Sequence, residues 1–232
     1  MAPKETPRQK MIGMMYLVLT AMLALNVDSA VLERFELING TLEEQIKNNG
    51  QRNGLTVKSI AAMVEEKGNR KDDVAVLKKA QEVRQKTDVI ISYMNKLKAE
   101  IIEDSGGKDE DGKLVGAKNM EKIAIYMIRY KRGDSLKTKL NEYTTWLSNA
   151  TGKEFASVAL DGKEDPYWSK IPNQRKKNFS ELMFESVPTA GGLASMSQLE
   201  GRLLDYEEVA LSVLSKKVGA KDLSFDKIVP MV

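Results

Sequence analysis

The sequence predicts an all-α protein in which a single N-terminal transmembrane helix leads into an extended helical bundle. An uninterrupted apolar run extends from Met11 to Leu25, and no later run approaches its length. Apolar residues recur with heptad spacing over residues 71–103 and again over residues 192–218. Long heptad segments joined by short polar breaks are typical of helices that pack side by side along their length.

The first predicted helix covers residues 7–27. As a helix, the run from Met11 to Leu25 is about 22 Å long, against roughly 30 Å of membrane hydrocarbon. Thr6 and Gln9 have the spacing of a capping box, and Pro7 occupies the first helical position, where its missing N–H has no cost. A helix that begins at Pro7 and ends near Val27 is long enough to cross the membrane.

A removable signal peptide is the alternative for this segment, because Arg8 and Lys10 precede an apolar stretch of suitable length. Cleavage requires small residues at the −3 and −1 positions. If Ala24 or Ala30 stood at −1, the residue at −3 would be Met22 or Asp28. Neither is small, so neither alanine completes that pattern. The sequence therefore favours a retained span.

Two faces of the predicted span differ in chemistry. Small and polar residues share one face, as in helices that contact other helices in lipid. The other face has the 3.5-residue period of a dimer seam, consisting of Met11, Met15, Val18, Met22 and Leu25. Tyr16, Thr20 and Asn26 place polar groups in hydrocarbon, which a mere anchor does not require.

The basic residues predict the orientation of the span. Lys4, Arg8 and Lys10 precede the apolar run, whereas Arg34 is the one basic residue among positions 27–46. The positive-inside rule then places residues 1–6 in the cytoplasm. We expect residues 28–219 to form a bundle outside the inner membrane, and residues 220–232 to be a linker.

Composition excludes several function classes. The chain has 36 basic and 33 acidic residues and no basic stretch interleaved with aromatics, so no nucleic-acid partner is expected. It has no cysteine and no histidine, which excludes disulfides, Cys/His zinc sites and nucleophiles activated by histidine. We expect no enzymatic activity, no catalytic or metal-binding residues and no cofactor.

Further helices are predicted along the rest of the chain. Heptad seams and flanking glycines indicate two long helices, and shorter apolar patterns indicate four others. The expected helices are 28–48, 54–67, 71–103, 116–132, 135–149 and 192–218, with breaks at Asn48-Asn49-Gly50, Lys67-Gly68-Asn69 and Gly133-Asp134 and a stop at Gly219.

The remaining segments carry weak signals. We expect residues 151–178 to form a strap whose Phe155, Tyr167 and Trp168 plug the bundle. Asp109-Glu110-Asp111-Gly112 lacks the alternating ligands of a calcium loop and is interpreted as a solvated turn. Glu207 and Glu208 are interpreted as the polar face of their helix.

The N-terminal segment resembles the signature of the GldM family, called PorM in non-gliding species. The resemblance rests on Pro7-Arg8-Gln9-Lys10-Met11-Ile12, Met15-Tyr16-Leu17-Val18 and the stretch from Ala21 to Val27. Weaker similarity appears at 184–188, 199–214 and 224–227. The chain stops at Val232, where the family's later, β-rich domains are expected to follow.

The resemblance implies a component of a motor driven by the proton-motive force, which powers type IX protein secretion and gliding motility. In that family the N-terminal helices of a homodimer sit within a ring of GldL subunits in the inner membrane. The periplasmic domains extend towards a ring associated with the outer membrane. The family arginine and tyrosine correspond to Arg8 and Tyr16, and Lys10, Thr20 and Asn26 are further expected contacts. An exported, membrane-anchored helical binding or scaffold protein stays open as the alternative.

Overall fold

The structure is a computed structural model that describes residues 6–219, apart from the side chains of residues 23–29. Within this range the chain is helical, and an isolated bridge pairs Lys108 with Leu114. The elements are α1 (Pro7–Glu66), α2 (Lys71–Asp104), α3 (Glu121–Ala124), the π-helix η1 (Ile125–Arg129), α4 (Arg132–Thr151), the 3₁₀ helix η2 (Trp168–Lys170), α5 (Phe179–Phe184) and α6 (Thr189–Val218). The expected all-α class is confirmed for the described residues.

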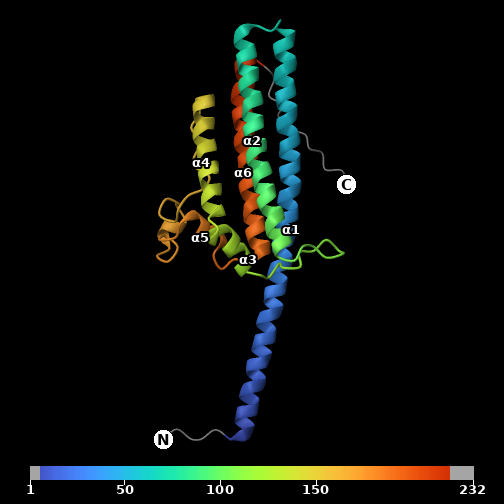
Figure 1. The fold of residues 1–232 in the computed structure, drawn as a ribbon, viewed down its shortest axis with the longest axis vertical. Helices are drawn as coiled ribbons and strands as arrows, with labels where there is room; N and C mark the ends of the chain where they lie inside the picture. Colours follow the sequence, from blue (N-terminus) through green and yellow to red (C-terminus); the bar gives the residue numbers. More distant parts are fainter. Residues whose placement is uncertain (1–5, 220–232) are drawn as a thin grey trace.

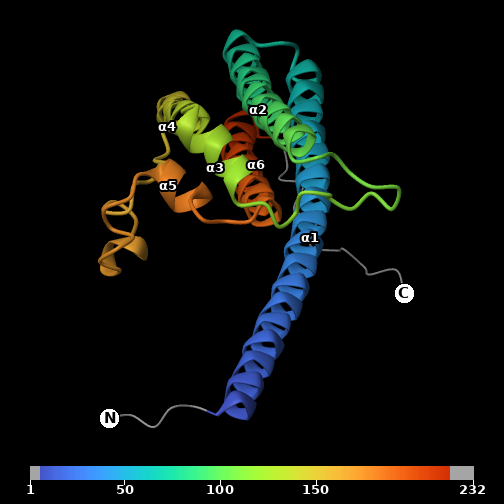
Figure 2. The ribbon, with the colours of Figure 1, turned by 60° about the horizontal axis from the view of Figure 1, so that its bottom comes forward.

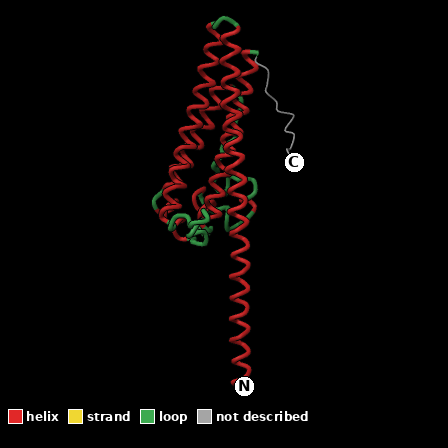
Figure 3. The backbone as a smooth tube through the Cα atoms, turned by 90° about the vertical axis from the view of Figure 1, so that its right-hand side faces the viewer, coloured by secondary structure: helices red, strands yellow, loops and turns green. Residues whose placement is uncertain are grey.

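Helices α1, α2 and α6 lie side by side along most of the bundle (Figure 1). Helix α1 and helix α6 run in the same direction, and α2 runs antiparallel to both. Helix α4 packs beside α2 and α6, while α5 and the segment before it lie at the bundle's outer side (Figure 2). The N-terminal part of α1 extends far beyond the other helices (Figure 3).

The predicted heptad seams form the core. The buried residues of α2 include Val83, Met94 and Leu97, and they belong to the same apolar cluster as Leu203 and Leu214 of α6. Helix α4 adds a further apolar row consisting of Leu136, Leu140, Tyr143 and Leu147. Gly219 ends α6 with a φ of 66°, as the sequence indicates.

The predicted break at Asn48-Asn49-Gly50 is wrong, because α1 continues through it without interruption to Glu66. Tertiary contacts supply the reason. The Asn49 amide donates to Asp205 of α6, and Asn53 is buried against the same helix. These bonds offset the low helix propensity of asparagine and glycine. The next break is confirmed, since Gly68 and Asn69 both have positive φ.

The connection between α2 and α4 also differs from expectation. A helix was predicted over 116–132, yet residues 116–120 form turns, and the Asn119 side chain caps a helix that begins at Glu121. Helix α4 begins at Arg132, so the predicted break at Gly133-Asp134 is wrong. Gly133 packs so close to Ser180 that a Cβ would lie 2.5 Å from the Ser180 hydroxyl oxygen.

The segment 151–178 is irregular apart from η2, as predicted, but only part of it plugs the bundle. Phe155 packs against the core, with its ring centroid 5.2 Å from that of Tyr206. Trp168 is half-buried. Tyr167 is 65% exposed, so its expected role as a plug is wrong. The Asp165 carboxylate accepts from the Tyr167 backbone N–H in a turn, and the Tyr167 ring meets that of Trp168 edge-on at the surface.

The close approach of α6 to α3 provides a test of this packing. A Cβ at Gly192 would lie 2.1 Å from Cδ1 of the fully buried Ile123, whereas one at Gly201 would meet nothing within 4 Å. Gly192→Ala should lower the free energy of unfolding by about 2 kcal/mol, because overpacking forces a shift in the core. Gly201→Ala should raise it by about 1 kcal/mol, because alanine favours the helix. Denaturant unfolding followed by circular dichroism measures both, and equal effects would contradict this packing.

Candidate functional site

The N-terminus of α1 has the predicted cap. The Thr6 hydroxyl accepts from the Gln9 backbone N–H, and the Gln9 side chain accepts from the Thr6 backbone N–H, which completes the capping box. Pro7 occupies the first turn. This local chemistry fixes where the helix begins and places Arg8 and Lys10 in its first turn, both exposed.

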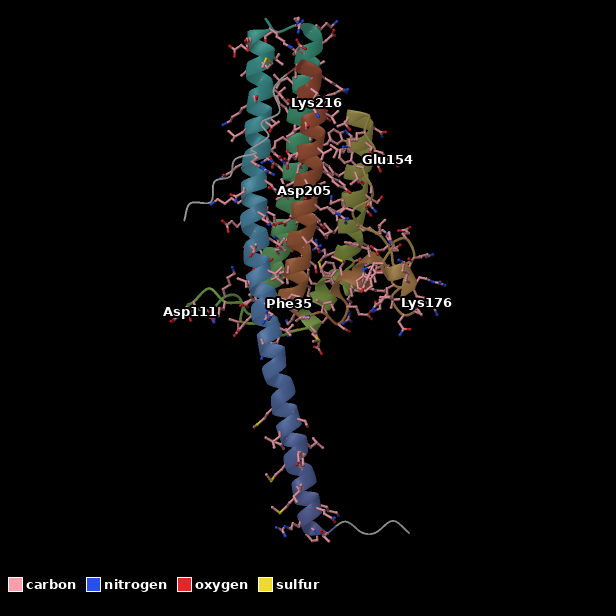
Figure 4. The ribbon with its side chains drawn as sticks, turned by 180° about the vertical axis from the view of Figure 1, so that it is seen from behind. Phe35, Asp111, Glu154, Lys176, Asp205 and Lys216 are labelled. Atoms are coloured by element: carbon pink, nitrogen blue, oxygen red, sulfur yellow. The ribbon has the colours of Figure 1, made fainter. Side chains whose placement is uncertain are left out.

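Between Met11 and Met22, α1 presents an apolar surface that nothing in the described chain covers. Most of its large side chains are more than half exposed. The sulfur atoms of the methionines on this part of α1 point away from the helix (Figure 4). Tyr16 is 68% exposed, and the Thr20 hydroxyl donates to the Tyr16 carbonyl oxygen. Leu25 and Asn26 lie outside the side chains that the structure describes.

The predicted dimer seam lies within this exposed segment. Met11, Met15, Val18 and Met22 are each exposed by more than half. The seam's role in dimerisation stays a prediction. No helix among the described residues meets the length and apolarity needed to cross a membrane. The predicted span over residues 7–27 is therefore not confirmed.

Above the exposed segment, a series of polar side chains joins α1 to α6, which we call the α1–α6 ladder. Asn39 accepts from the Ser197 hydroxyl at 2.7 Å, and Asn49 donates to Asp205 at 3.0 Å. Further up, Arg52 pairs with Glu208 at 2.8 Å. At its upper end, Lys67 donates to the carbonyl of Val218. The two helices that the ladder joins run in the same direction (Figure 1).

The ladder also includes Glu207 of α6, which is buried and bonds to Asn53 of α1. Its side chain is fully enclosed, which corrects the interpretation of Glu207 as part of a polar helix face. It accepts from the Asn53 amide at 2.8 Å and from Arg84 of α2 at 3.0 Å. Burial raises the pKa of this carboxyl to about 7, although the bonds from Asn53 and the charge of Arg84 lower it. Glu208, by contrast, is half exposed, as expected.

A second buried ion pair lies nearer the exposed segment. Lys98 of α2 donates to Glu200 at 2.7 Å and to the Ser197 hydroxyl at 3.1 Å. Burial raises the pKa of the Glu200 carboxyl, and the charge of Lys98 opposes that shift. Both clusters combine a glutamate of α6 with a cation of α2, so each ties these two helices together.

The sequence carries a signal for both clusters in the spacing of their charged residues. Glu200 and Glu207 are seven residues apart on α6, and Lys98 and Arg84 are two heptads apart on α2. Glu207 also falls between Leu203 and Ala210, within the buried stripe of its helix. A charge that recurs inside an apolar heptad stripe indicates a buried pair.

The acidic segment around Asp109 forms a turn. Asp109 uses its carboxylate to accept from the backbone N–H groups of Asp111 and Lys113, which makes this segment a turn. No group of three metal-ligating side chains gathers anywhere in the described chain. The strongest arrangements are the exposed apolar segment, the ladder and the two buried pairs.

The described chain thus consists of one long helix with an exposed apolar segment at one end and a helical bundle at the other. Residues 30–217 match the GldM N-terminal domain, and the chain belongs to the GldM family. Members of this family are structural motor components of gliding motility and type IX secretion and are not enzymes. No curated protein matches the chain.

The buried pair of Lys98 and Glu200 generates a prediction. Lys98→Met should lower the free energy of unfolding at pH 8 by about 3 kcal/mol, because it leaves a buried carboxylate without its cation. Replacing both residues by methionine should recover most of that loss. Lys96→Met is the matched control, since the Lys96 side chain is 74% exposed and lies 3.9 Å from Glu100. A loss that the double variant does not recover would contradict the pairing.

Proposed function

We propose that this chain is the membrane-anchored, non-enzymatic subunit of an inner-membrane motor that the proton-motive force drives. In this proposal residues 7–27 cross the inner membrane with residues 1–6 in the cytoplasm, and residues 28–219 lie in the periplasm. The motor's motion would pass through the bundle to power type IX secretion and gliding.

The observation that carries the proposal is the continuity of α1. A single helix of 60 residues joins the exposed apolar segment to the ladder and the core. An exposed apolar surface of this size needs lipid or other helices to cover it, because water does not favour it. Any displacement of the covered segment is then passed directly to the bundle, since no flexible linker interrupts the helix.

Arg8 is proposed to act at the membrane end. Its guanidinium stays charged at any physiological pH, so it cannot carry the proton itself. A carboxylate of a surrounding ring subunit can be held by Arg8 while ionised, and protonation largely removes that attraction. Release from one carboxylate and capture by the next would step the helix around the ring.

The polar residues of the exposed segment are proposed to assist this exchange. Tyr16 lies about 12 Å further along the helix than Arg8 and would orient a water or a partner group. Lys10, Thr20 and Asn26 would contact the same ring. Thr20 already donates to carbonyls within α1, so it can remain in an apolar environment without an unpaired hydroxyl.

The proposed partners follow from this arrangement. A second copy of the chain would pair along the seam of Met11, Met15, Val18, Met22 and Leu25, and a ring of GldL-like subunits would surround the pair. The periplasmic bundle would pass its motion towards a ring associated with the outer membrane.

The central test removes the charge of Arg8. Arg8→Ala should abolish gliding or secretion, because the ring carboxylate loses its counter-charge, while the far-ultraviolet circular dichroism of the purified chain stays unchanged. Lys4→Ala is the control, since it removes one positive charge ahead of the helix. Normal secretion by Arg8→Ala at normal protein levels would contradict the motor role. A mature N-terminus near Ala30, measured by intact mass, would contradict the retained span.

The seam gives a second test. The chain has no cysteine, so single cysteines report on one position each. Cysteine at Met15 or Met22 should cross-link to its own copy in native membranes, because a parallel pair brings identical seam positions together. Cysteine at Leu17, on another face of the helix and 71% exposed, should cross-link far less. Equal yields at all three positions would argue against this seam.

A further inference from the structure

The Glu207 cluster joins three helices through one carboxylate. Asn53 of α1 donates to Glu207 and also to the Leu204 carbonyl, so it binds α6 at two points. Arg84 of α2 donates to Glu207 from the other side. The state of this carboxylate therefore affects contacts on both neighbouring helices.

Several charged groups lie near the cluster, and among them Lys47 and Lys58 of α1 line the same surface cavity as Arg84 and Asp88. Arg84 also reaches Asp88 of its own helix at 3.1 Å, and the Asp88 side chain is 51% exposed. On the α1 side, Arg52 pairs with Glu208. From α4, the Tyr143 hydroxyl shares a hydrogen bond with Thr87, and burial raises its pKa, so this tyrosine stays neutral near pH 7.

Arg84 thus stands between a buried carboxylate and an exposed one. We propose that Glu207, Arg84 and Asn53 form a proton-sensitive joint, in which protonation of Glu207 releases Arg84 to Asp88 while Asn53 keeps α1 bound to α6. The proton comes from solvent and remains on a Glu207 carboxyl oxygen, and Arg84 keeps its own charge throughout. The bond between α2 and α6 is lost, and the bond between α1 and α6 is kept.

An unpartnered atom beside the carboxyl supports this joint. Asn53 Oδ1 is buried and accepts no hydrogen bond from the described residues. Ionised Glu207 can only accept hydrogen bonds, so it cannot serve this oxygen. Once protonated, the carboxyl has an O–H that can turn to Asn53 Oδ1. Protonation therefore provides a donor where the ionised cluster lacks one.

The direction of the pH effect follows from linkage. The folded pKa of Glu207 is about 7, above its ordinary value of 4.5, so the folded chain binds this proton more tightly than the unfolded chain. The stabilisation is fully present below pH 4.5 and is lost as the pH rises through about 7. The free energy of unfolding should thus be larger in acid, even though the bond between Arg84 and Glu207 is lost there. This joint goes beyond the proposed motor, and only its physiological use rests on that proposal, because a periplasmic bundle faces the compartment that the proton-motive force acidifies.

The test compares the full chain in detergent micelles with three variants between pH 5.5 and 8.5. Wild-type protein should lose about 5 °C in thermal midpoint over this range through Glu207. Glu207→Gln should lack that part of the loss, because its side chain does not titrate. Glu208→Gln, which neutralises the adjacent exposed glutamate, should keep it. Glu200 titrates in every variant, so the difference between Glu207→Gln and wild type is the quantity measured.

A second measurement covers the case in which Glu207→Gln folds poorly. The infrared band of a protonated carboxyl should appear in wild-type protein near pH 7, and in Arg84→Gln at a higher pH, because the stabilising cation is gone. The rate of amide hydrogen exchange near Arg84 should differ between the ionised and the protonated form of Glu207. A wild-type midpoint that follows Glu207→Gln at every pH, or a band that moves to lower pH in Arg84→Gln, would overturn the joint. Neither readout needs the motor, so failure here leaves the Arg8 test standing, and the reverse also holds.

Discussion

The attachment of α1 to α6 is the constraint on which the rest of the molecule depends. Helix α1 buries few large apolar side chains of its own, among them Leu32, Ile60 and Val64. Its register against α6 is set instead by the ladder, whose bonds require one particular alignment of the two helices. A slip of one turn would separate the buried Asn53 amide from Glu207 and from the Leu204 carbonyl, and buried polar groups without partners are costly. The ladder therefore fixes how far the apolar segment projects from the bundle.

The sequence predicted the helices that apolar periodicity and caps define. The predicted bounds of α2 agree with the structure to within one residue. The Thr6 capping box and the helix end at Gly219 are both present as predicted. The errors fell where tertiary contacts override local preference. Asn48-Asn49-Gly50 has the composition of a turn, yet its neighbours bond to α6 and keep the helix intact. Gly133 was predicted to break the helix, but it lies within α4 and packs closely against Ser180.

The candidate site divides in the same way. The exposed segment could be predicted, because the sequence itself contains a long apolar run that follows two basic residues. The buried pairs were missed, since a single glutamate such as Glu207 looks like any surface glutamate until its partner helices are known. Its partners Asn53 and Arg84 lie 154 and 123 residues away along the chain. The heptad spacing of the glutamates narrows the choice, but only the packing of three helices shows which charges meet.

The continuous α1 also has a mechanical consequence. Leu32 packs with Ala117 and Ala190 where the helix leaves the bundle, which makes this contact a natural fulcrum. From there the helix extends about 38 Å to Pro7 and about 51 Å to Glu66. A rocking motion about Leu32 would thus be enlarged by roughly a third at the upper end, in the opposite direction. Helix α1 thus has the proportions of a lever, and its longer arm is the part above Leu32 that the ladder bonds to α6.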